Sequence, residues 1–289
     1  MEDDLSVYRQ KFGLPECSTR NGCLSIIAPN GAPAADDQWS AETAIDVEMV
    51  SAICPLCKIT IVEALSANIG DLAAAVDKAA SLHPAAISNS YAVPEAEDNT
   101  HFKDHYHHDG MAIVAGAGDT GYGVNFPASA ATVVAVGGTS VLQKPDGTFA
   151  APTVWAGTGS GCSAFISKPS YQHDTGCKNR TANDIAALAD PETGVIAYTN
   201  KKSGWAVYGG TSVATPIVAA LYALSGNATN VHDPSNLYAN ASLLYSIRGS
   251  NGVCSPAYLC NAGSGFSGPA GNGVPYGIAA FGPPLPSHH

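Results

Sequence analysis

Basic residues are scarce in this chain, and charge of either sign is sparse. Lys and Arg together number 13 against 24 Asp and Glu, so the formal net charge is −11 at pH 7, and charged residues make up only 13% of the 289 positions. Nucleic acids and anionic membrane surfaces are bound through clustered Lys and Arg, so neither is expected as a partner. A low content of basic residues also limits positive self-repulsion at low pH, where carboxylates become neutral.

Long hydrophobic runs are absent as well. No apolar stretch reaches the ~18 residues of a membrane span, so no membrane segment is expected. Hydrophobic residues nevertheless make up 45% of the chain, which is enough for one large core. No internal repeat and no linker divides the sequence. We therefore expect a single domain over residues 1–289 that acts as a monomer.

The eight cysteines fall into four close pairs. An even number in local pairs predicts disulfides formed in an oxidising compartment, and therefore a secreted, extracellular protein. The 54–57 segment (CPLC) also has the CxxC form of a redox or zinc site. Without a second CxxC nearby, a structural disulfide is favoured there. The predicted bridges are Cys17–Cys23, Cys54–Cys57, Cys162–Cys177 and Cys254–Cys260.

Apolar strands and helical segments alternate along the chain. Helices are predicted over 39–53, 69–82 and 104–109, and strands over 58–64, 85–90, 111–115 and 132–136. This order indicates the α/β class, with a mostly parallel central sheet covered by helices on both faces. Ligand sites in such sheets lie beyond the carboxyl ends of the strands, which is where Ser90 and Asp119 are expected. The stretch 143–190, rich in Gly, Pro and Ser, is predicted to form loops or a hairpin beside that edge.

The segment 209–216 (GGTSVATP) places Ser212 between small residues, directly ahead of an apolar helical run. Small neighbours let a substrate carbonyl approach the hydroxyl. The start of a helix supplies free N–H groups and the positive end of a dipole. Both features suit a nucleophilic serine whose attack creates an oxyanion. Taken alone, the segment fits equally well a turn leading into a buried helix.

Two carboxylates stand four residues apart in a largely apolar segment. Glu42 and Asp46 would face the same side of the helix predicted for 39–53. Like charges at this spacing repel each other, so the pair does not stabilise the helix. Two carboxyls in a poorly solvated place tend to share one proton, which suits general-base work in acid. In isolation, the pair also fits two solvated carboxylates on a surface helix.

A third carboxylate follows a buried strand. The segment 113–121 (IVAGAGDTG) predicts a strand that runs into a Gly-rich turn presenting Asp119. An aspartate that only caps the turn would explain this segment by itself. A protonated aspartic acid in a dry site can instead donate a hydrogen bond to a developing oxyanion.

These three segments, in this order and spacing, resemble the motifs of the serine-carboxyl peptidases, the sedolisin family. The segments 126–129 (FPAS), 134–140 (VAVGGTS) and 189–194 (ADPETG) are also similar to that family, so the resemblance covers nearly the whole chain. It implies a subtilisin-like fold and an acid-active serine endopeptidase that works through an acyl-enzyme. The family is made with a large N-terminal prodomain. The chain therefore resembles the catalytic domain alone, with its own prodomain and protein or peptide substrates as expected partners.

The resemblance also implies a role for each candidate residue. Ser212 would be the nucleophile, and Glu42 the base that takes its proton. Asp46 would orient Glu42 and share its charge, and Asp119 would help to form the oxyanion hole. A catalytically silent relative that only binds peptides is the alternative, but such a protein would need none of these four residues.

A subtilisin-like protease with a histidine base shares the serine motif and is the nearest rival. That class needs a histidine in a His-Gly-Thr setting, and none of the nine histidines has this context. Four of them, His101, His105, His107 and His108, crowd the polar stretch 98–110. Their irregular spacing favours a surface segment over a metal site. A histidine base is therefore not expected.

The chain departs from the family pattern at two places. Tyr91 stands where many relatives have a tryptophan beside the carboxylate pair. The family's calcium site uses two aspartates, an aliphatic residue and backbone carbonyls, and the corresponding positions here hold Ser246, Ile247 and Ser267. Calcium affinity rises with the number of carboxylates, so no metal and no other cofactor is expected unless Asp233 serves as a displaced ligand.

Overall fold

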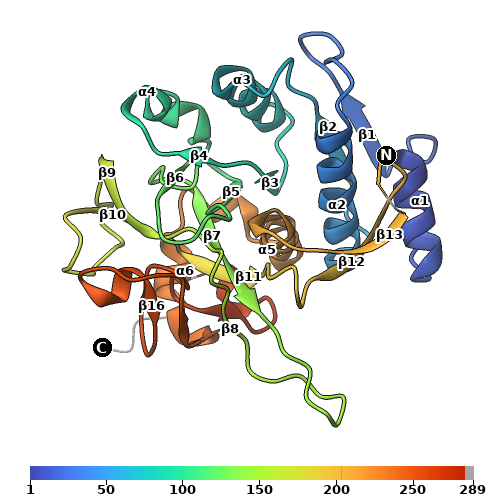
Figure 1. Cartoon of the computed structure of the whole chain (residues 1–289). Coiled ribbons are helices and arrows are strands. Elements are labelled where there is room, and N and C mark those ends of the chain that lie inside the picture. The colour runs from blue at the N-terminus through green and yellow to red at the C-terminus, as the bar shows by residue number, and fades with distance from the viewer. Residues whose placement is uncertain (203, 284–289) are drawn as a thin grey trace.

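The computed structural model describes residues 1–202 and 204–283. A central sheet with strand order β11-β7-β5-β3 runs through the molecule, and helices lie on both sides of it (Figure 1). All three pairings along this order are parallel, and β8 adds a short antiparallel pair to β7. The predicted α/β class with a mostly parallel sheet is therefore confirmed. The five strands are β3 (Ala86–Asn89), β5 (Ala112–Gly116), β7 (Val134–Ser140), β8 (Thr153–Val154) and β11 (Ile185–Leu188).

The other elements surround this sheet. In chain order they are α1 (Glu2–Lys11), β1 (Leu24–Ile27), α2 (Asp37–Ile53), β2 (Ile59–Val62), α3 (Ile69–Ala80), β4 (Val93–Pro94), α4 (Glu97–Thr100), η1 (Lys103–Tyr106), β6 (Asn125–Phe126), β9 (Gly161–Ser167), β10 (Asn179–Ala182), β12 (Val195–Thr199), β13 (Gly204–Tyr208), α5 (Thr211–Ser225), η2 (Ala228–Asn230), α6 (Ser235–Ala239), η3 (Ala241–Leu243), β14 (Leu244–Tyr245), β15 (Gly249–Ser250), η4 (Ala257–Leu259), β16 (Asn261–Ala262), β17 (Val274–Pro275) and η5 (Ala279–Phe281).

Burial on both faces explains why the central strands are apolar at every position. Successive side chains of a strand point to opposite faces. Ala112 and Val114 of β5 join the core cluster that contains the inner face of α5. Ile113 and Ala115 join a second cluster on the side of α3. The sheet therefore holds α5 and α3 on opposite faces, and every β5 residue is buried.

Most predicted elements are present, with shifts at their ends. α2 begins two residues before the predicted start because Asp36 caps it, its Oδ1 accepting from the N–H groups of Gln38 (2.8 Å) and Trp39 (2.9 Å). The helix predicted over 104–109 is wrong in kind, since the chain forms the short 3-10 helix η1 there. The polar residues of that stretch cannot bury a helical stripe, so only one turn forms.

The prediction that 143–190 consists of loops or a hairpin was wrong in one respect. The stretch does contain the antiparallel pair β9–β10, but it also contains β11, a strand of the central sheet. β11 has the sequence IAAL, which is short and carries one β-branched residue, so its propensity signal is weak. Pairing with β7 overrides that weak propensity. The antiparallel hairpin β12–β13, just ahead of α5, was not predicted either.

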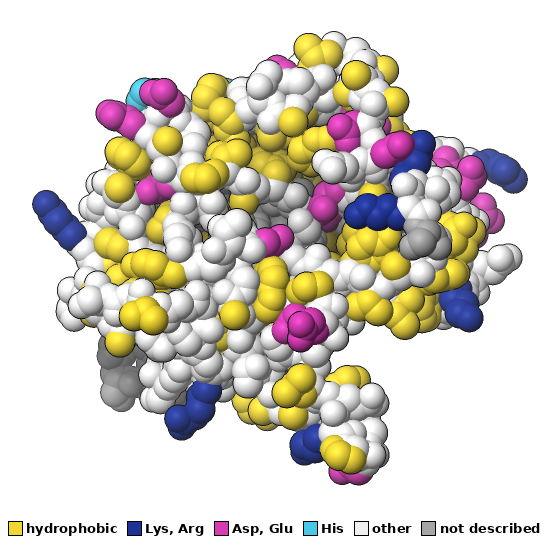
Figure 2. Space-filling view, in the orientation of Figure 1, with side chains coloured by type: hydrophobic (Ala, Val, Ile, Leu, Met, Phe, Trp, Pro, Cys, Tyr) yellow, Lys and Arg dark blue, Asp and Glu magenta, His cyan; other side chains and the backbone are white. Residues whose placement is uncertain are grey.

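All four predicted disulfides are present, and no cysteine of the chain is free. The CxxC pair Cys54–Cys57 closes the turn after α2, so it is a structural bridge in this fold. Across residues 1–202 and 204–283, no helix has the length and apolarity that a membrane crossing requires. Figure 2 shows acidic side chains around a hollow in one face of the molecule, with basic side chains both beside them and scattered farther out.

A buried carboxyl ties α2 to the β12–β13 hairpin. Glu48 is fully buried, and its Oε2 accepts a hydrogen bond from the N–H of Tyr198 at 2.9 Å. Its Oε1 has no hydrogen-bond partner among the described residues. Burial raises the pKa of Glu48 to about 8, with a lowering contribution from the bond to Tyr198 and a raising one from Asp4. Glu48 therefore keeps its proton at the pH where most glutamates are ionised.

Glu48 should make the protein more stable in acid than near neutrality. Its folded-state pKa of about 8 lies above the ordinary value of 4.5, so the folded state binds this proton more tightly than the unfolded state. The stabilisation is fully present below about pH 4.5 and is lost as the pH rises through about 8. We expect the melting temperature to fall over this range, and to fall less in Glu48→Gln, whose amide has no proton to lose. Thermal unfolding followed by circular dichroism measures both, and parallel curves for the two proteins would contradict the assignment.

Candidate active site

The site is built where α2 packs beside α5 (Figure 1). Ile45 and Met49 of α2 form an apolar cluster with Val213, the residue after Ser212. Gly210 has φ +104°, a conformation that side chains other than glycine rarely adopt, and it turns the chain from β13 sharply into α5. Ser212 is consequently the second residue of the helix, where backbone N–H groups have no intrahelical acceptor.

The two predicted carboxyls of α2 face this turn from a poorly solvated place. Burial raises the pKa of Glu42 to about 7, an interaction with the Ser212 side chain lowers it, Asp119 raises it and Lys202 lowers it. Burial and then the neighbouring Glu42 raise the pKa of Asp46 well above its usual range. Two interacting acids in such a site release their protons in separate steps that belong to the pair as a whole. The alternative of two solvated surface carboxylates is excluded by this burial.

Asp119 is held against the same helix turn. Its Oδ1 accepts two hydrogen bonds from Thr211, one from the N–H at 2.7 Å and one from Oγ1 at 2.9 Å. Thr211 Oγ1 in turn accepts from the N–H of Gly118 at 3.1 Å. These contacts join the turn after β5 to the start of α5. They leave Oδ2 on the side of Gly210, within 2.8 Å of where a Cβ on that glycine would lie.

Ser90 is part of the site, although the sequence indicated only that it would lie at this edge of the sheet. Its Oγ donates to Asp46 Oδ1 at 2.6 Å and lies 3.2 Å from the carbonyl oxygen of Ser212. Tyr91, the next residue, has its hydroxyl on Asn89 Oδ1 at 3.0 Å and near that of Tyr106 at 3.1 Å. The one sequence signal for Ser90 was its position just after β3.

Histidines of the polar stretch 98–110 contact acidic side chains outside the candidate site. His105 Nδ1 and His108 Nε2 lie 2.6 Å and 3.0 Å from the two carboxylate oxygens of Asp77 on α3. His232 Nδ1 lies 2.9 Å from Asp109. These pairs hold η1 and its flanks against neighbouring elements at the partly exposed surface.

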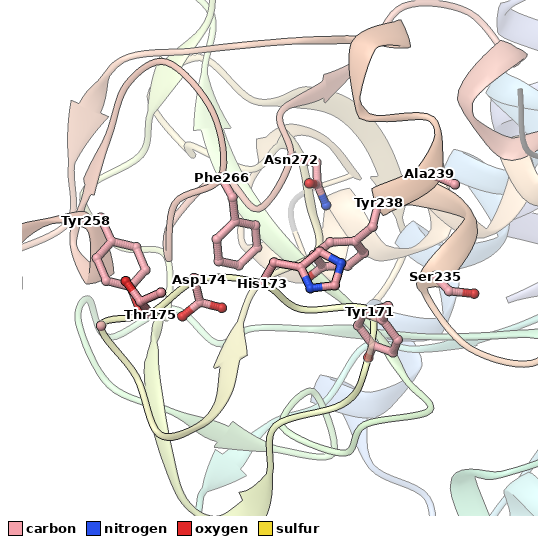
Figure 3. Close-up of a pocket in the computed structure, with 11 residues that line it drawn as sticks. Tyr171, His173, Asp174, Thr175, Ser235, Tyr238, Ala239, Tyr258, Phe266 and Asn272 are labelled. Atoms are coloured by element: carbon pink, nitrogen blue, oxygen red, sulfur yellow. Dashed lines mark hydrogen bonds between the residues drawn. The ribbon is translucent and has the colours of Figure 1, made fainter. Parts of the chain in front are cut away.

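A cavity of about 710 Å³ lies apart from these residues (Figure 3). Its walls include the rings of Tyr171, Tyr238, Tyr258 and Phe266. The three tyrosine hydroxyls are used by hydrogen bonds to Ala131 O, Asp184 and Asp174, so the cavity presents ring faces. None of the four predicted catalytic residues lines it.

Several known proteins are similar to this chain. No family model matches the chain. It is 29% identical to kumamolisin of Bacillus sp. (strain MN-32) over 301 residues, covering 90% of this chain and 53% of that protein. It is 33% identical to sedolisin of Pseudomonas sp. (strain 101) over 172 residues, covering 53% of this chain and 29% of that protein. The chain thus spans about half or less of the length of these relatives.

Among solved structures, the chain is similar to Pseudomonas sedolisin, described as a serine-carboxyl proteinase complexed with two molecules of pseudo-iodotyrostatin. The TM-score is 0.78 at 26% identity, and the match covers 94% of this chain and 85% of that one. The fold is therefore that of sedolisin, a subtilisin-like arrangement with a mostly parallel sheet flanked by helices.

The positions that correspond to the family's calcium site do not fit a calcium ion. Ile247 packs in an apolar cluster with Ala186, Ala270 and Val274. Ser267 Oγ is buried without a hydrogen-bond partner among the described residues. In the part of the chain that the structure describes, no group of three or more His, Cys, Asp or Glu residues could hold a metal ion. Neutral hydroxyl and carbonyl oxygens alone neutralise none of the ion's charge.

Two other features restrain this region. Ser267 and Gly271 exchange backbone hydrogen bonds at 3.0 Å and 2.8 Å, and the Cys254–Cys260 bridge closes a neighbouring loop. Asp233, the displaced-ligand candidate, accepts a hydrogen bond at 2.8 Å from the N–H of Ser235, the first residue of α6.

We expect folding stability to be independent of calcium. The melting temperature should be the same, within error, in excess calcium and in chelator. The double variant Ser246→Asp with Ser267→Asp restores two carboxylates and should acquire a melting temperature that rises with calcium. Thermal scans at about pH 5.5, where introduced aspartates are ionised, measure both proteins side by side. A drop of several degrees for the wild-type protein in chelator would mean that other oxygens complete a working site.

Proposed function

The chain is a peptidase domain of the sedolisin family, and from this premise we propose that it is an acid-active serine-type endopeptidase that hydrolyses peptide bonds through an acyl-enzyme at Ser212. One observation carries the proposal. Ser212, the second residue of α5, lies beside two poorly solvated carboxyls, Glu42 and Asp46, whose pKa values are raised by burial. A buried glutamate with this raised pKa can accept and return a proton, which is the work of a general base and acid.

In the proposed reaction, Glu42 takes the proton of the Ser212 hydroxyl as the oxygen attacks the substrate carbonyl. The resulting oxyanion accepts hydrogen bonds from the N–H of Ser212 and from protonated Asp119. Glu42 then returns the proton to the leaving amine, the C–N bond breaks, and the acyl group remains on Ser212. Water, activated by Glu42, releases the acyl group in the reverse order. Asp46 holds the second proton of the pair and limits the charge on Glu42.

The catalytically silent alternative receives no support from the site. A module that only binds peptides has no use for a buried acid pair, which costs stability when it ionises.

The wider setting of the enzyme is proposed on the same basis. Four disulfides suit an oxidising compartment, so we infer a secreted, extracellular enzyme. Relatives of this family act on proteins or peptides and are made with prodomains, and we propose the same substrates and an N-terminal prodomain before maturation. The net charge of −11 argues against nucleic acid or anionic membrane as a partner. The domain is proposed to act as a monomer without a cofactor.

Removing the nucleophile should abolish cleavage and preserve the fold. We expect Ser212→Ala to lose several orders of magnitude in kcat/KM, and Glu42→Gln to be nearly as damaging because an amide cannot accept the proton. The matched control is Ser225→Ala at the other end of α5, which should retain full activity. Hydrolysis of denatured protein at about pH 4 gives the measurement, with circular dichroism to verify folding. Substantial turnover by Ser212→Ala would rule out this nucleophile.

Activity should be highest in acid and fall before neutrality. The acid pair must keep one proton for the proposed reaction, and Asp119 can donate to the oxyanion only when its carboxyl carries a proton. Asp119→Asn replaces that donor with an amide that donates at any pH, so the ratio of activity at pH 7 to activity at pH 4 should rise in this variant. Initial rates across pH 3 to 8 test both statements. A neutral or alkaline optimum in the wild-type protein would instead favour a histidine-based triad.

A further inference from the structure

Ser90 joins the three elements that make up the site. It follows the last residue of β3 in the central sheet. Its Oγ donates to Asp46 Oδ1 on α2 at 2.6 Å and lies 3.2 Å from the carbonyl oxygen of Ser212 on α5. The same hydroxyl therefore contacts one member of the acid pair and the backbone of the nucleophile.

A hydroxyl carries one hydrogen but has two neighbours here. When Asp46 is ionised, the hydrogen points to Asp46, which is the shorter contact. When Asp46 is protonated, its own O–H can donate to Ser90 Oγ, and the Ser90 hydrogen turns to the carbonyl of Ser212. Both protonation states of Asp46 are thus hydrogen-bonded. Without the hydroxyl, an ionised Asp46 would lose a charge-assisted hydrogen bond in a buried site.

Few other groups stabilise the ionised form of the Glu42–Asp46 pair. Burial and Glu42 both raise the pKa of Asp46, and the Ser90 hydrogen bond is the influence that lowers it. Around Glu42, Asp119 from the turn after β5 raises the pKa, whereas Ser212 and Lys202 from α5 and the β12–β13 turn lower it. Loss of the Ser90 hydroxyl would therefore favour the state in which both carboxyls are protonated and no base is present.

We propose that Ser90 is a positioning residue of the catalytic set, whose hydroxyl stabilises the Glu42–Asp46 pair with one proton in acid, so that the pair as a whole can take up the proton of Ser212. The proposal rests on the proposed peptidase function. It assigns to Ser90 no contact with the reacting atoms.

The first test compares pH profiles of kcat and KM. Ser90→Ala should lose about tenfold in kcat at pH 4, with KM unchanged, because a hydrogen bond to a charged group is worth roughly one or more units of pKa. The acidic limb of the profile should move up by about one pH unit, so the loss shrinks toward pH 6. Ser90→Thr keeps the hydroxyl and should restore the wild-type limb.

Ser88→Ala is the matched control. Ser88 lies two residues earlier on the same strand, and its buried Oγ has no hydrogen-bond partner among the described residues. Its removal should leave the profile unchanged. A loss in Ser90→Ala that is equal at every pH, or a limb that does not move, would show a merely structural role and overturn the proposal.

A second measurement does not depend on turnover. Carbon-13 NMR of labelled aspartate in the Ser212→Ala background, with Asp46→Asn to assign the signal, follows the titration of Asp46 directly. Adding Ser90→Ala should move that titration up by about one pH unit, and an unchanged midpoint would overturn the proposal. If the wild-type protein cleaves no peptide, the proposed function fails, while this titration still decides the role of Ser90.

Discussion

The packing of α2 against α5 is the contact on which the site depends. Ile45 and Met49 form one apolar cluster with Val213, and the carboxyls lie on the same helix as the first two of these residues. Burial of apolar side chains is strongly favourable and non-directional. It can therefore hold acidic side chains in a poorly solvated place, although desolvation is unfavourable for their charged forms. Ser212 then meets Glu42 because both stand beside the cluster. A loosened cluster would separate Ser212 from Glu42, the proposed nucleophile and base, even with every side chain of the proposed catalytic set intact.

Desolvation of acidic side chains on α2 affects both the proposed chemistry and the pH dependence of stability. Glu42, Asp46 and Glu48 all lie on α2, and burial is the largest cause of the raised pKa of each. A helix that buries three acids is better suited to acid, where their charge is reduced, than to neutral solution. The raised pKa values are therefore a property of the α2 environment as a whole, and hydrogen bonds from Ser90 and from the Tyr198 N–H lower the pKa of Asp46 and Glu48 locally.

The loops around β14 and β17 are restrained by apolar packing and backbone hydrogen bonds. Ile247 packs with Val274 in a small apolar cluster, and Ser267 and Gly271 exchange backbone hydrogen bonds. Neutral groups and a disulfide do not titrate in acid, whereas carboxylate ligands lose their charge there. The contacts named here therefore do not depend on a titrating side chain.

The sequence by itself determined the class of fold, the four disulfides and the candidate residues Glu42, Asp46, Asp119 and Ser212. The fold class and the disulfides depend on local signals, which are apolar periodicity and close cysteine spacing. The four candidate residues depend on the resemblance of their segments, taken together, to those of the serine-carboxyl peptidases. The tertiary structure decided the rest. β11 forms because β7 offers a partner to a weak IAAL segment. Ser90 enters the site because β3 ends where α2 and α5 meet. Strand pairing and burial bring together residues that are far apart in the chain. No local pattern could therefore show which hydroxyl reaches Asp46, or that Glu42 and Asp46 are desolvated.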